Sequence, residues 1–246
     1  MYKSHPTFKQ PVNEDIKVWR YMDFTKLVSL LDSRRLFFNR ADLFSDPFEG
    51  SWPKENYLNR GIRPDKNSKV TLEEYERANK EHGEKNKEWR KHMAVSCWHM
   101  NEFESAAMWK LYLKSNEGIA IQSTYTKLKK AFIDDEIIFM GTVGYIDYEE
   151  DFIEPHNVFP PFVHKRKSFE HEREVRALVS PWFTRDAKEP LNGGVQIRMD
   201  IETLVEKIYV APSAPAWFTE LTSAVVGRYG YNFPVEQSSL DESPVF

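Results

Sequence analysis

Hydrophobic and polar positions at the start of the chain predict a strand, a helix and a second strand. Residues 18–21 and 36–38 are short apolar runs of the β type. Between them, Leu27, Leu30 and Leu31 recur with the 3.6-residue period of a helix. Asp23 or Thr25 can cap this helix, because short polar side chains accept hydrogen bonds from the free amides of a first turn.

The remaining pattern alternates between the same two kinds of element. We expect further strands at residues 93–98, 118–122, 173–179, 195–199, 206–210 and 230–235. We expect further helices at residues 71–91, 103–114, 124–132 and 215–228, with a short one ending over 165–169. Residues 136–148 predict a long strand or a bent pair, whereas residues 42–50, 54–70 and 151–163 read as loops or irregular chain. Strands and helices interspersed without a strict βαβ rhythm favour an α+β fold with a mixed sheet.

Composition supports one globular domain over residues 1–246. The 17 Phe, 11 Tyr and 7 Trp residues can fill a sizeable core, and only 10 Gly residues argue against a low-complexity chain. Residues 1–15 are predicted as a polar arm and residues 236–246 as a polar tail. The net charge of −4 gives no global basic excess, so binding of a nucleic acid would need a local patch.

The cysteine count and the hydropathy argue against a disulfide-bonded, a secreted and a membrane-spanning protein. Cys97 is the one cysteine, so the chain cannot form an internal disulfide or a cysteine-based zinc site. The first residues lack the apolar region of a secretory leader, and no stretch approaches the ~18 apolar residues of a membrane-spanning helix. We therefore expect a cytoplasmic protein with no membrane partner.

Arginines and acids in the first fifty residues are the first candidates for chemistry. Arg20, beside Tyr21 in a strand-like run, can hold a phosphate or carboxylate through two bonds, or form a structural ion pair. Arg40 precedes a loop that carries Asp42, Asp46 and Glu49. These acids could bind a divalent metal, but capping of turns is the favoured interpretation.

The middle of the chain offers weaker signals. Ser96 lies in the strand at 93–98, and no histidine or carboxylate stands at a spacing that would indicate a nucleophilic triad. Tyr112 follows Met108 and Trp109 at helical spacing, which is typical of core packing. Stacking of Tyr112 on the flat ring of a ligand is the alternative.

The charged segment near residue 170 is the most informative. On a strand, Glu172, Glu174 and Arg176 share one face, because side chains alternate with a period of two. Two neighbouring carboxylates raise the pKa of one another unless a cation intervenes, and Arg176 can supply that cation. Such a row is either a solvated sheet face or a functional site.

Five of these motifs, in this order, resemble the bacterial family of unknown function numbered 2971. The resemblance spans residues 18–212. The matching segments are Trp19-Arg20-Tyr21 with its Leu-rich helix, Asn39 to Gly50, Ser96-Cys97-Trp98, Met108 to Ile121, and Lys165 to Arg176.

The order of Arg, Ser and Glu-x-Glu is also similar to the ADP-ribosyltransferase superfamily. The resemblance implies a split sheet, NAD as the substrate, and a nucleic acid or protein acceptor, in a toxin or phage-defence effector. It gives Arg20 the orientation of NAD and Ser96 the bracing of the nicotinamide ribose. Glu174 becomes catalytic with Glu172 as helper, or Glu172 alone is catalytic. Tyr21, Arg40, Arg176 and Tyr112 are further candidates to contact NAD. The motif departs from the superfamily, since Cys97 and Trp98 follow Ser96.

Two other functions stay open. A metal-dependent nuclease could hold Mg²⁺ with Asp46, Glu172 and Glu174, with Lys165 or Lys167 orienting a phosphate. A non-catalytic module could bind a nucleotide or a partner through arginines and rings. Under the enzyme hypothesis, we expect the rings beside the charged motifs to line or brace one cleft. These rings are Trp19, Tyr21, Phe44, Phe48, Trp98 and Phe169.

Overall fold

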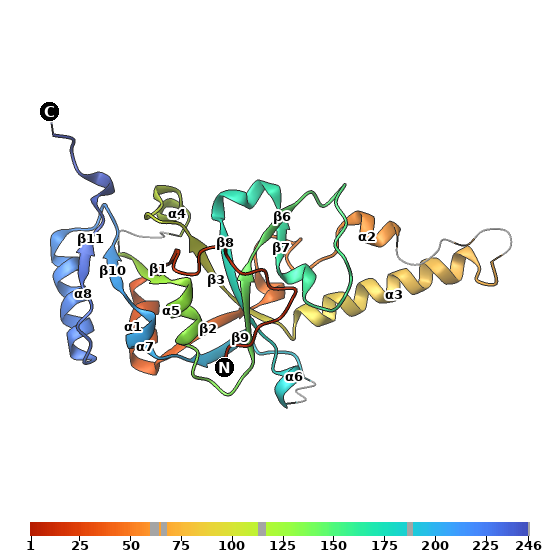
Figure 1. The fold of residues 1–246 in the computed structure, drawn as a ribbon, viewed down its shortest axis with the longest axis horizontal. Coiled ribbons are helices and arrows are strands. Elements are labelled where there is room, and N and C mark those ends of the chain that lie inside the picture. The colour runs from red at the N-terminus through yellow and green to blue at the C-terminus, as the bar shows by residue number, and fades with distance from the viewer. Residues whose placement is uncertain (60–63, 65–67, 113–116, 186–188, 246) are drawn as a thin grey trace.

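The computed structural model describes residues 1–59, 64, 68–112, 117–185 and 189–245. It has a mixed α+β architecture in which helices flank a nine-stranded, mostly antiparallel sheet (Figure 1). The strands are β1 (Lys17–Asp23), β2 (Arg35–Arg40), β3 (Ala94–Met100), β4 (Gly118–Thr124), β5 (Ile138–Thr142), β8 (Glu174–Val179), β9 (Gly194–Arg198), β10 (Lys207–Val210) and β11 (Val235–Gln237). Two short strands, β6 (Gly144–Ile146) and β7 (His164–Arg166), pair separately in parallel.

The helices cover the sheet at its two faces and its edge. They are α1 (Phe24–Ser33), α2 (Lys54–Leu58), α3 (Leu72–Arg90), α4 (Ala106–Tyr112), α5 (Tyr125–Lys130), α6 (Trp182–Arg185), α7 (Ile201–Leu204) and α8 (Ala216–Arg228). In Figure 1, α3 projects away from the sheet, and the last residue of α2, Leu58, contacts Tyr75 near the outer end of α3. Among the described residues, no helix combines the length and the apolar character that crossing a membrane requires.

The central strand β3 explains why the sheet is split. Along one edge, β3 pairs with β8 from Ala94 to His99. Along the other edge, β1 pairs with His99 and Met100, whereas β2 pairs with Ala94 and Val95. Residues 96–98 of this edge face no strand of the described chain. The strands β1 and β2 therefore diverge around a gap, which agrees with the expected split sheet.

Helix α1 connects the two diverging strands and forms as the sequence predicts. The Asp23 carboxylate accepts a hydrogen bond from the Lys26 amide, so Asp23 is the cap. Leu27, Leu30 and Leu31 are buried on the inner face of the helix. Arg34 ends the helix in the left-handed conformation, with φ of 51°.

The chain termini are more ordered than the sequence suggests. Residues 1–15, expected as a polar arm, run along β5, where the Lys3 amide donates to the Ile138 carbonyl and the Thr142 amide to the Lys9 carbonyl. Phe8 is buried against Phe139 in this contact. The expected tail begins within β11, which pairs with β10. Backbone hydrogen bonds and one buried ring together hold this otherwise polar segment against β5.

Several expected boundaries shift. Residues 54–70, expected to be irregular, contain α2, although residues 60–63 and 65–67 lie outside the described chain. The expected helix at 103–114 is α4, and its last two residues are likewise outside. The expected bent pair at 136–148 becomes β5 and β6. The strand expected over 230–235 starts only at Val235. Lys165 lies on β7 instead of ending a helix.

Candidate functional site

A cavity of about 670 Å³ opens at the split between β1 and β2. Its size falls in the usual range for small-molecule sites. Among the residues predicted for the site, Arg20, Tyr21, Tyr112, Glu172 and Glu174 all line this cavity. The structure therefore brings together side chains from β1, α4 and the segment that leads into β8.

Arg20 bridges the gap in the sheet. Its guanidinium donates hydrogen bonds to the Ser96 hydroxyl, at 2.9 Å, and to the Cys97 carbonyl, at 2.6 Å. It also lies 5.8 Å from the centre of the Trp98 ring. Burial lowers the pKa of Arg20, but an arginine retains its charge in proteins. A half-buried cation thus stands at the wall of the cavity.

Three predicted residues do not line the cavity. Ser96 is fully buried and binds Arg20, so its contact with the cavity is indirect. Arg176 is buried beneath the carboxyl pair. Arg40 is held by the Asp42 carboxylate and the Leu191 carbonyl, whereas its neighbour Asn39 lines the cavity.

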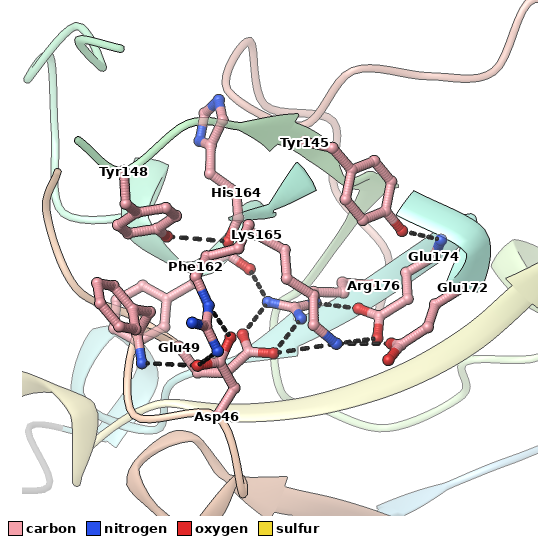
Figure 2. A network of polar contacts seen from close by, with 12 residues as sticks. Asp46, Glu49, Tyr145, Tyr148, Phe162, His164, Lys165, Glu172, Glu174 and Arg176 are labelled. Carbon is pink, nitrogen blue, oxygen red and sulfur yellow. Dashed lines mark hydrogen bonds and ion pairs between the residues drawn. The ribbon is translucent and has the colours of Figure 1, made fainter. Parts of the chain in front are cut away.

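Glu172 and Glu174 meet at one ammonium group. Lys165 Nζ lies 2.6 Å from Glu172 Oε2 and 3.1 Å from Glu174 Oε1 (Figure 2). The sequence predicts that the two carboxyl groups share one face of a strand, but in the structure they do not. Glu172 ends the 3₁₀ helix Lys167–Glu172, and Arg173 then adopts a left-handed conformation with φ of 42° before β8 begins. The kink at Arg173 replaces strand alternation as the cause of their proximity.

A second cation lies under the pair. Arg176 Nε donates to Glu174 Oε2 at 2.6 Å, and Arg176 Nη2 donates to Glu49 Oε1 at 2.8 Å (Figure 2). Its remaining nitrogen donates to the Phe162 carbonyl. Glu49 therefore acts as an internal counter-ion, although turn capping was the favoured interpretation. The network contains three carboxyl groups and two cations, Lys165 and Arg176.

This imbalance separates the pKa values of the two glutamates. Burial and the neighbouring Glu174 raise the pKa of Glu172 to about 7. Burial opposes ionisation of Glu174 too, but Arg176 and Lys165 outweigh it and hold the pKa of Glu174 well below its usual range. At neutral pH, Glu174 is ionised, while Glu172 is protonated in about half of the molecules.

His99 fixes the backbone at Glu172 and was missed by sequence reasoning. Its Nδ1 lies 2.6 Å from the Glu172 carbonyl oxygen. Since a carbonyl can only accept, Nδ1 carries the proton. Burial is the largest influence on His99 and lowers its pKa, which keeps the ring neutral. His99 and Glu174 lie opposite each other only through the β3–β8 register, so no local pattern of the sequence marks this contact.

The acidic loop at residues 42–50 closes one side of the site. Asp46 accepts from the Phe48 amide, as a turn cap does, and also from Arg166 Nη2 at 2.8 Å. Asp42 instead forms an ion pair with Arg40. Among the described residues, no three acidic, histidine or cysteine side chains gather so as to hold a metal ion. The carboxylates proposed for Mg²⁺ thus contact cations of the chain.

Rings form much of the cavity wall. Five of the six rings singled out in the sequence line it, whereas Phe48 lies outside the lining and stacks beneath Arg166. The lining rings are Trp19, Tyr21, Phe44, Trp98 and Phe169, joined by Phe37 and Tyr112. A separate aromatic group surrounds Phe8 and Phe159, so only part of the aromatic excess belongs to the cavity.

No protein-family model matches the chain, and no curated protein matches it, so its resemblance to family 2971 has no support there. Similar solved structures include three complexes of DarT from Thermus sp. 2.9. The complex with ADP-ribosylated ssDNA has a TM-score of 0.42 at 10% identity, covering 94% of this chain and 96% of that one. The NAD+ complex has a TM-score of 0.42 at 9% identity, with coverage of 94% and 98%. The carba-NAD+ complex has a TM-score of 0.39 at 9% identity, covering 92% of this chain and 96% of that one.

Proposed function

We propose that the chain is an NAD-dependent ADP-ribosyltransferase that modifies a nucleic acid or a protein. The observation that carries the proposal is the shared cavity, in which Arg20 and the carboxyl pair line one space at the split of the sheet. The cellular setting, a toxin or a phage-defence effector, follows the resemblance in the sequence.

The electrostatics of the cavity suit cleavage of a glycosidic bond. Breaking the bond between nicotinamide and ribose builds positive charge on the sugar, and a preplaced carboxylate stabilises that charge. Glu174 is such a group, because its pKa keeps it ionised at neutral pH. Lys165 and Arg176 hold its two oxygens in place. In this proposal Glu174 is the catalytic residue.

Glu172 has a different role in the proposal. Its side chain is 12% exposed, against 5% for Glu174, so it lies closer to an incoming acceptor. With a pKa of about 7, it can take up the proton that the acceptor group loses on transfer. The pair thus divides into a charge-stabilising carboxylate and a proton-accepting one.

The other end of the ligand would lie toward Arg20. A guanidinium can bind a phosphate oxygen, and the pyrophosphate of NAD is the anionic part of the molecule. Tyr21 and Tyr112 stack with ring centres 6.5 Å apart and offer aromatic surface beside Arg20. Ser96 acts here by positioning Arg20, not by touching NAD.

Release of nicotinamide from NAD tests the proposal. We expect wild-type protein to release nicotinamide in the presence of acceptor, and Glu174→Gln to lower the rate by about 100-fold or more. Glu170→Gln is the matched control, because Glu170 is an exposed acid of the same segment. Equal rates for wild type and Glu174→Gln would remove the carboxyl pair from the chemistry. Tight NAD binding without any release would favour the non-catalytic module.

A further inference from the structure

A second cavity, of about 400 Å³, lies between α3, the segment containing α2 and the loop after β6. Helix α3 is charged and mostly solvated, yet four of its residues face this cavity. They are His82, Lys85, Asn86 and Trp89. Steps of three, one and three residues place them on a single face of the helix. A helix face that packs into a core carries mainly aliphatic side chains. This face of α3 instead carries polar side chains and one aromatic ring.

Aromatic side chains enter the cavity from three separate segments. Trp89 comes from α3, Trp52 from the chain before α2, and Phe152 from the loop after β6. Phe152 is 47% exposed. An exposed ring at the border of a cavity provides a stacking surface for a flat ligand.

Polar groups of this cavity lack partners in the part of the chain that the structure describes. The Lys85 ammonium, the Asn86 amide and the Trp52 indole N–H make no hydrogen bond or ion pair there. Lys87 of the same helix pairs with Glu84, and Lys91, just after the helix, pairs with Glu88. A cation, an amide and an indole donor thus remain available around the rings.

The second cavity shares a wall with the first. Glu49 lines the first cavity, and the next residue, Gly50, lines the second. Phe162 lines the second cavity, while its carbonyl accepts from Arg176 of the carboxyl network. One stretch of backbone therefore separates this cavity from the proposed reaction site.

We infer that the second cavity binds one nucleotide of a single-stranded nucleic acid, with its base among the rings and its phosphate at Lys85. Bases stack on aromatic side chains whatever their sequence, amides bond base edges, and a lysine neutralises a phosphate. The inference rests on the proposed function, of which it specifies the acceptor as a nucleic acid. The strand would then pass from this cavity across the wall at Gly50 toward Glu172.

Binding of a labelled oligonucleotide, without NAD, tests the inference separately from catalysis. Fluorescence anisotropy of 12-nucleotide single-stranded DNA and RNA would be measured with wild type, Phe152→Ala and Lys85→Ala. We expect each variant to weaken binding by about fivefold or more. We also expect Lys85→Ala to reduce the salt slope of binding by about one. Comparison of the DNA and RNA arms identifies the acceptor sugar.

Matched controls keep the result specific to the cavity. Phe103→Ala removes an exposed ring that lines neither cavity, and Lys87→Ala removes a charge of α3 outside the cavity. Both should bind as wild type does. Unchanged binding by Phe152→Ala and Lys85→Ala, or no binding by wild type, would overturn the inference even if nicotinamide is released. Weakened binding by both variants without nicotinamide release would support the inference while the proposed reaction fails.

Discussion

The Arg20 guanidinium binds the Cys97 carbonyl across the split in the sheet, at 2.6 Å. On this edge of β3 no described strand pairs with Cys97, so a side chain satisfies an acceptor that a backbone amide would satisfy in a continuous sheet. The same bond holds Arg20 beside the cavity. Opening of the sheet and placement of the proposed phosphate-binding group are therefore one structural feature.

Replacement of Arg20 should affect both stability and binding. Arg20→Lys keeps the charge but cannot reproduce the two bonds of the guanidinium fork. We expect the free energy of unfolding to fall by about 1–3 kcal/mol, because the Cys97 carbonyl loses its partner. We expect NAD affinity, measured by calorimetry, to fall about tenfold. Full NAD affinity in Arg20→Lys would show that Arg20 acts only within the sheet.

The left-handed residue before β8 should tolerate glycine and reject a branched side chain. Arg173→Gly fits φ of 42° without steric cost, so we expect unchanged or slightly higher stability. Arg173→Val should cost about 1–3 kcal/mol, since a β-branched residue disfavours this region. It should also lower nicotinamide release, because Glu172 would leave Lys165. Thermal unfolding and activity of the two variants give the comparison, and similar losses in both would contradict it.

Stability should depend on pH through Glu172. Its folded pKa of about 7 exceeds the ordinary value near 4.5, so the folded state binds this proton more tightly than the unfolded chain. The stabilisation is complete below pH 4.5 and is lost as pH rises through 7. Between pH 5 and 8, wild type should lose about 1–3 kcal/mol more than Glu172→Gln, which cannot titrate. Urea unfolding at several pH values measures this, and parallel curves would refute it.

The buried network should respond strongly to loss of Arg176. Arg176→Met leaves Lys165 as the one cation that Glu49 and Glu174 share, and removal of one partner from a buried pair costs about 3–5 kcal/mol. Lys54→Met, which breaks the exposed pair with Glu149, should cost less than about 1 kcal/mol. Urea unfolding of both variants provides the measurement. A small effect of Arg176→Met would mean that water replaces the lost cation.

Local patterns predict the parts of the fold that depend on local interactions. The cap at Asp23, the buried stripe of α1 and the solvated α3 follow from propensity and periodicity, and all are present. The mixed sheet also follows from the alternation of elements. Of the residues predicted for one site, Arg20 and the two glutamates line one cavity, whereas Ser96 is buried behind Arg20.

Contacts between distant segments account for what the sequence did not predict. Strand alternation predicted that Glu172 lies on the same strand as Glu174. In the structure Arg173 between them is left-handed, and His99 binds the Glu172 carbonyl. No local pattern reveals this contact between distant segments. Lys165 was expected at the end of a short helix, yet pairing of β7 with β6 places it in a strand. Arg40 and Ser96 have suitable chemistry, but the register of β2 and β3 directs them away from the cavity.

The pairing of Glu49 with Arg176 has a consequence for the timing of synthesis. These residues are 127 positions apart, so their ion pair closes a long loop late in folding. A growing chain that has not yet reached Arg176 also lacks Glu174, and its lone acidic loop cannot form the network. The network therefore forms only after β8 has been made and has paired with β3.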